Sequence, residues 1–206
     1  MALKKIDRQA LPARPALNSF FTVTMLSLGL PMFLMGDEAR RTQHGNNNAY
    51  CQDDESNWSL VAKHADVYRF VKLLIARRLS RNTGPERRRM TLTQLISGAT
   101  KNWHGVKLNQ PNWSDQSHSV AFSAKLKEEG LLVYFIFNAY WERLEFELPR
   151  PEKNEGGYWR RWIDTFLDMP QDIVPWQEAP SVPDPTYRAG PRSVVVLWAG
   201  LDDGAL

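Results

Sequence analysis

Two adjacent acids follow a short apolar run near the start of the chain. The run is residues 31–35, and Asp37 and Glu38 come directly after the glycine that ends it. Carboxylates can act as general acids, general bases or nucleophiles when they converge on one bond. Adjacent residues of a strand point to opposite faces of a sheet, however. We therefore do not expect Asp37 and Glu38 to work together as a catalytic pair.

A long polar loop over residues 40–58 is the second region with chemical potential. Loops of this length inside a compact domain are usually functional or disordered. Amide and carboxylate groups could hydrogen-bond a polar substrate, and a tyrosine ring could stack on it. Alternatively, asparagine and aspartate could cap their own backbone. Both interpretations stay open for the candidate substrate-binding residues of this loop, which are Asn46, Asn47, Asn48, Tyr50, Gln52 and Asp53.

Tryptophan is unusually frequent, with eight residues in a chain of 206. The face of an indole can cover the apolar C–H face of a pyranose, but tryptophan also buries a large area in cores and interfaces. Trp103, Trp113 and His118 could form a surface platform for a sugar. The alternative, which we favour, is that they pack between two parts of the molecule.

The first part of the chain has the pattern of an α/β unit. Residues 16–28 predict a buried helix with Gly29 at a left-handed cap, and the run at 31–35 predicts a strand buried on both faces. An apolar stripe predicts a second helix over residues 63–79. A barrel of such units needs roughly 250 residues. The first 85 residues would therefore belong to something larger.

After about residue 85 the pattern changes to short candidate strands separated by turn residues. Leu144, Phe146 and Leu148 alternate with glutamates, which indicates a strand with one wet face. These features favour an antiparallel β-sandwich. The candidate strands are residues 119–126, 131–138, 143–148, 158–164 and 193–198.

Composition restricts the remaining classes of function. The net charge is +3, and the basic run at residues 87–89 has no aromatic residues interleaved with it, so we expect no nucleic-acid partner. The single cysteine, Cys51, cannot form a disulfide framework within one chain, and the scattered histidines do not suggest a metal site. We expect no metal and no cofactor. No run is apolar enough to span a membrane, so we expect a cytoplasmic protein without a membrane partner.

Several sequence runs resemble one family of enzymes. Residues 27–38 read SLGLPMFLMGDE, which resembles the last barrel strand of the α-amylase superfamily. Residues 42–53 read TQHGNNNAYCQD, which is similar to the isoamylase and glycogen-debranching branch of that superfamily. Later runs resemble the C-terminal domain of the same branch: WHGVKL at 103–108, PNWS at 111–114, HSVAF at 118–122, FNA at 137–139 and RSVVVL at 192–197.

The resemblance implies the last part of a (β/α)₈ TIM barrel over residues 1–85 and an antiparallel β-sandwich over residues 86–206. It also implies a parent enzyme that hydrolyses the α-1,6 branch points of glycogen, starch or limit dextrin with retention of configuration, which requires two carboxylates. The family carries these carboxylates on segments such as Gly-Phe-Arg-x-Asp, which this sequence does not contain. Asp37 and Glu38 would then hold loops at the strand end.

We therefore expect this chain to be catalytically inactive when it is alone. Its partner would be the missing front of the barrel, and the substrate of the assembled enzyme would be a branched α-glucan. Two alternatives remain. The chain could be a glucan-binding or assembly module that complements another chain, or it could be the product of a split gene without an independent role.

Overall fold

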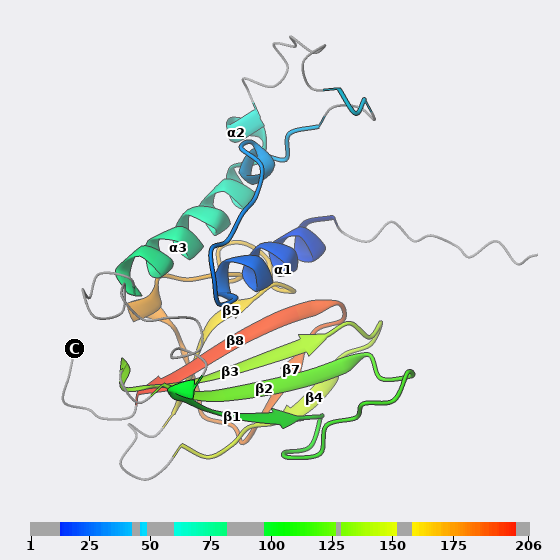
Figure 1. The fold of residues 1–206 in the computed structure, drawn as a ribbon, viewed down its shortest axis with the longest axis vertical. Helices are drawn as coiled ribbons and strands as arrows, with labels where there is room; N and C mark the ends of the chain where they lie inside the picture. The colour runs from blue at the N-terminus through cyan, green and yellow to red at the C-terminus, as the bar shows by residue number, and fades with distance from the viewer. Residues whose placement is uncertain are drawn as a thin grey trace, which may run out of the picture.

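The computed structural model describes residues 13–42, 46–48, 60–81, 97–126, 129–151 and 158–200. Within these ranges, a layer of helices lies against one face of a large antiparallel sheet, and a small sheet covers the other face (Figure 1). The helical layer consists of α1 (Ala13–Leu26), the 3₁₀ turn η1 (Asp37–Ala39), α2 (Leu60–Lys63) and α3 (Ala65–Arg81). None of the described helices is long and apolar enough to cross a membrane.

The large sheet has six antiparallel strands in the order β1-β2-β3-β8-β5-β6. The small sheet pairs β4 with β7, and the 3₁₀ turn η5 (Trp176–Glu178) lies between β5 and β6. The strands are β1 (Ala99–His104), β2 (Ser119–Leu126), β3 (Leu131–Asn138), β4 (Leu144–Glu147), β5 (Trp159–Asp164), β6 (Ser181–Val182), β7 (Thr186–Ala189) and β8 (Ser193–Gly200).

Strand β8 lies in the interior of the large sheet and is buried along nearly its whole length. Because neighbouring side chains of a strand point to opposite faces, its residues divide between two cores. Val194 and Val196 pack with the helices, and Val195 and Leu197 pack in the interior of the sandwich. This double burial explains why the run from Val194 to Leu197 is apolar without alternation.

The helices share one core with the sheet. Val67, Phe70 and Leu74 of α3 are fully buried, and they belong to the same cluster as Trp162 and Ile163 of β5. The apolar stripe predicted for the second helix is therefore confirmed. The helical layer and the sandwich fold as one packed unit over the residues that the structure describes. The proposed domain boundary at residue 85 lies outside them.

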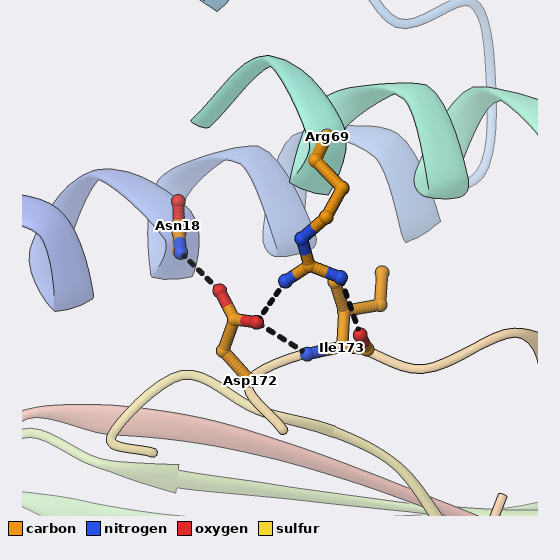
Figure 2. A network of polar contacts seen from close by, with 4 residues as sticks. All are labelled: Asn18, Arg69, Asp172 and Ile173. Carbon is orange, nitrogen blue, oxygen red and sulfur yellow. Dashed lines mark hydrogen bonds and ion pairs between the residues drawn. The ribbon is translucent and has the colours of Figure 1, made fainter. Parts of the chain in front are cut away.

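A buried polar network adds a second connection between the helices and the sandwich (Figure 2). The carboxylate of Asp172, in the loop after β5, forms an ion pair with Arg69 of α3 and accepts a hydrogen bond from Asn18 Nδ2 of α1 at 3.3 Å. Arg69 Nη1 also donates to the backbone oxygen of Ile173 at 2.9 Å. One loop of the sandwich thus holds both long helices.

The structure corrects the expected strand over residues 31–35, because these residues form no strand. The segment is extended and lies at the surface: Leu30 is 98% exposed, Met32 is 90% exposed and Met35 is 81% exposed. An apolar strand needs neighbours at its edges and on both faces. Within the described ranges no strand pairs with it. The barrel part of the expected fold is accordingly not seen.

The other expected elements agree well with the structure. Strands β2 and β3 have the predicted bounds. Strand β4 is one residue shorter at each end, and β5 and β8 differ by one and two residues at one end. The two long helices begin and end within three residues of the expected positions. Gly29 has φ of +98°, a left-handed conformation, but α1 ends at Leu26, so this glycine lies three residues beyond the end of the helix and not at its cap. Strands β1, β6 and β7 were not expected from the sequence.

Candidate functional site

Asp37 and Glu38 lie in a tight turn at the end of the extended segment. Asp37 Oδ2 accepts the backbone N–H of Leu34 at 3.0 Å, and Glu38 Oε2 accepts that of Gly36 at 2.8 Å. Gly36 has φ of +103°, and a Cβ atom there would lie 2.9 Å from the side chain of Arg41. Each carboxylate therefore stabilises its own turn. The two are not directed at a shared point.

Two open hollows flank the extended segment. The larger one, of about 620 Å³, lies between the segment and α1, with Asp37, Arg40 and Arg41 among its lining residues. The other, of about 420 Å³, lies between the segment and α3. Phe33 contributes to both, and its ring meets Phe21 edge-on at 6.0 Å. The floors of the hollows are mainly apolar, and charged groups lie among their lining residues.

The polar loop is described only in part. Asn46, Asn47 and Asn48 are exposed, and Asn46 Oδ1 accepts the backbone N–H of Asn48 at 2.9 Å. This bond is the self-capping contact that the sequence analysis offered as an alternative to sugar binding. Tyr50, Gln52 and Asp53 lie outside the described residues. A role of the loop in substrate binding thus stays a prediction.

The three residues considered for an aromatic platform do not lie in one group. The rings of Trp103 and Trp113 meet at 5.5 Å, and Trp103 also contacts Phe122 at 4.9 Å. His118 contacts Tyr140 and Trp141 instead, each at 6.0 Å. The platform is therefore divided into two aromatic groups.

A second histidine, His104, has a structural role. His104 is buried, its Nδ1 accepts the backbone N–H of Asn109 at 2.9 Å, and its Nε2 lies 2.9 Å from Ser123 Oγ. Burial lowers the pKa of this imidazole. Beside it, a Cβ atom on Gly105 would lie 2.4 Å from the backbone oxygen of Gln110, so the turn after β1 requires glycine. The run at 103–108 is thus constrained by packing.

Comparison with known proteins shows which family this architecture belongs to. Residues 102–190 match the family model described as "Isoamylase 1-3, C-terminal". The chain is 34% identical over 165 residues to "Isoamylase 1, chloroplastic" of Arabidopsis thaliana, an alignment that covers 77% of this chain and 19% of that protein. It is 41% identical over 107 residues to "Glycogen debranching enzyme" of Pectobacterium atrosepticum, covering 50% of this chain and 16% of that protein. This chain carries the C-terminal domain of isoamylase-type debranching enzymes.

Solved structures support the same fold for this isoamylase-type chain. A pullulanase from Bacillus acidopullulyticus superposes with a TM-score of 0.62 at 22% sequence identity, covering 88% of this chain and 20% of that chain. Pullulanase type I from Bacillus subtilis gives a TM-score of 0.63 and covers 93% of this chain and 24% of that chain. The alignments with two curated isoamylases cover 19% and 22% of their length, so this chain spans about a fifth of those relatives.

The isoamylase C-terminal match contains both aromatic groups and Asp172, whereas the turn with Asp37 and Glu38 precedes it. Tyr140 and Trp141 were missed by the sequence analysis. The available signal was two adjacent aromatic residues just after a predicted strand, beside Asn138. Within the described ranges, no group of three or more His, Cys, Asp or Glu side chains gathers as a metal site would require.

Proposed function

We propose that this chain is the C-terminal part of an enzyme that hydrolyses α-1,6-glucosidic branch points in glycogen or a related glucan. The observation that carries this proposal is the match of residues 102–190 to the isoamylase C-terminal family model. Relatives named as isoamylases and as a glycogen debranching enzyme support it. In the assembled enzyme, the loop with Asn46, Asn47 and Asn48 borders the glucan cleft.

The chain alone is inactive in this proposal. Retaining hydrolysis of a glycoside requires two carboxyl groups about 5–5.5 Å apart on opposite sides of the scissile bond. Asp37 and Glu38 accept backbone N–H groups of their own turn, which leaves neither of them directed at a shared bond. The catalytic carboxylates would come from a preceding (β/α)₈ barrel, which would cover the exposed segment around Met32.

A reducing-sugar assay on glycogen tests this proposal. The pure 206-residue chain should release no reducing ends, and a longer product that includes the reading frame upstream of Met1 should release them. Turnover by the pure chain would contradict the assignment of catalysis to a preceding barrel. An upstream DNA sequence without an open frame that carries the family's carboxylate segments would contradict a preceding barrel in the same polypeptide.

A further inference from the structure

Tyr140 and Trp141 form an aromatic pair at the surface, just after β3. Their ring centroids lie 3.9 Å apart, with the planes 31° from parallel. Trp141 is 58% exposed, and the exposed ring of His118, just before β2, lies 6.0 Å from both. Exposing so much indole is unfavourable in water. The pair therefore offers an apolar face to a ligand.

The backbone that carries this pair is rigidly held. Asn138 is 1% exposed, and its Nδ2 donates to the backbone oxygens of Glu142 at 3.0 Å and Gly190 at 2.7 Å. Its Oδ1 accepts the backbone N–H of Tyr140 at 3.1 Å. The backbone oxygen of Tyr140 in turn accepts the N–H of Arg192 at 3.0 Å. A surface fixed before binding loses little conformational entropy when a ligand arrives.

The surroundings of the pair differ from those of Trp103 and Trp113. Phe122, which contacts Trp103, also lines an apolar groove of about 220 Å³ beneath α1. The Trp103 group thus continues the apolar face of the helical layer, as a protein interface would. The chain segments that hold Tyr140 and Trp141 instead present exposed polar side chains, those of His118, Glu142 and Arg192.

We propose that Tyr140, Trp141 and His118 form a binding site for a glucose unit of an α-glucan chain. The indole face of Trp141 stacks on the apolar C–H face of the sugar, because an aromatic ring offers a large apolar surface. The ring nitrogens of His118, 6.0 Å from both aromatic rings, would hydrogen-bond hydroxyl groups at the edge of the sugar. The choice of an α-glucan rests on the proposed function, whereas the sugar site itself rests on the geometry.

Native gel electrophoresis of the 206-residue chain in gels containing glycogen tests this inference. The wild-type chain should be retarded relative to a gel without polysaccharide. Trp141→Ala should weaken the apparent affinity by about tenfold or more, as truncation of a central aromatic contact does at binding sites. Trp141→Phe should retain part of the retardation, because the ring is kept. Trp113→Ala is the matched control, since it removes an exposed indole from the other aromatic group, and it should bind as the wild type does.

The possible results separate the inference from the proposed function. If no polysaccharide retards the wild type, or if Trp113→Ala loses retardation while Trp141→Ala keeps it, the site at Trp141 is refuted and the hydrolysis assay still decides the proposed function. Retardation in a β-glucan gel but not in glycogen would refute the α-glucan assignment and count against the proposed function as well. Unchanged thermal unfolding of Trp141→Ala would show that a loss of binding does not reflect misfolding.

Discussion

The imidazole of His104 is held in one protonation state by its two hydrogen bonds. Nδ1 accepts the backbone N–H of Asn109, so in the neutral ring the proton lies on Nε2, which donates to Ser123 Oγ. A second proton would have to bind Nδ1 and would break the bond from Asn109. Burial also disfavours the charged ring and lowers its pKa. His104 is therefore a structural histidine that works only when it is neutral.

Acidification should destabilise the protein through His104. Because the pKa of this residue is lower in the folded state than its usual value of 6.5, the unfolded chain binds more protons as the pH falls below 6.5. The free energy of unfolding should then fall by at most about 1.4 kcal/mol for each pH unit. Urea unfolding at several pH values measures this slope. His104→Gln should flatten it; a slope that this substitution leaves unchanged would refute the assignment.

At the scale of elements, Asp172 connects α1 and α3 to the loop after β5. The residue is fully buried, and Asp172→Ala would leave Arg69 and Asn18 without the partner shown in Figure 2. Because Arg69 is partly exposed, we expect a loss of about 2–3 kcal/mol in the free energy of unfolding. Asp172→Asn should lose less, because an amide oxygen can still accept hydrogen bonds.

Chemical denaturation of the two Asp172 variants measures this prediction. Glu145→Ala is the matched control, because Glu145 also accepts a hydrogen bond, from Thr186 at 2.8 Å, but lies at the surface. It should change stability by no more than about 0.5 kcal/mol. If Asp172→Ala and Glu145→Ala lowered the free energy of unfolding equally, the buried network would stabilise the fold no more than a surface hydrogen bond does.

The sequence predicted those helices and strands whose buried positions can be recognised from the spacing of their own apolar residues. The stripe through Val67 and Phe70 was predictable because one packed layer buries it. The strand over 119–126 was predictable because turn residues in the sequence separate it from the next apolar run. Strand β1 was not, since it lies at the sheet edge and four of its six residues are exposed, which leaves no alternation to read. The strand expected at 31–35 failed for a different reason. An apolar run indicates that its side chains are buried somewhere, but it does not indicate which part of which polypeptide packs against them.

The candidate site was predictable to a smaller extent. The sequence offered Trp103, Trp113 and His118 as a platform or as packing residues. Their ring contacts could not be predicted, because these depend on which strands pair and on how the loops between them fold. The register of β1 against β2 places Trp103 opposite Phe122. Tyr140 becomes a neighbour of His118 because the end of β3 lies beside the start of β2. Such a relation is fixed by topology and is not visible in spacing along the chain.

At the scale of the whole molecule, the exposed segment around Met32 is the feature that the described fold leaves unexplained. Leu30, Met32 and Met35 are each at least 81% exposed, although large contiguous apolar surfaces on soluble proteins usually mark an interface. The hollows on either side of Phe33 extend this surface toward α1 and α3. In the proposed enzyme, the preceding barrel would cover it.

This segment should contribute to association and not to the stability of the isolated chain. The triple variant Leu30→Ser, Met32→Gln and Met35→Gln should change the free energy of unfolding by no more than about 0.5 kcal/mol, because side chains this exposed lose little packing when replaced. It should also reduce the binding of a hydrophobic dye and any concentration-dependent self-association, measured by analytical ultracentrifugation. As the matched control, Phe21→Ala removes a buried side chain of α1 and should cost about 3 kcal/mol or more. A large loss of stability in the triple variant would show that the segment packs within this chain, and the barrel would then not be needed to account for its apolar residues.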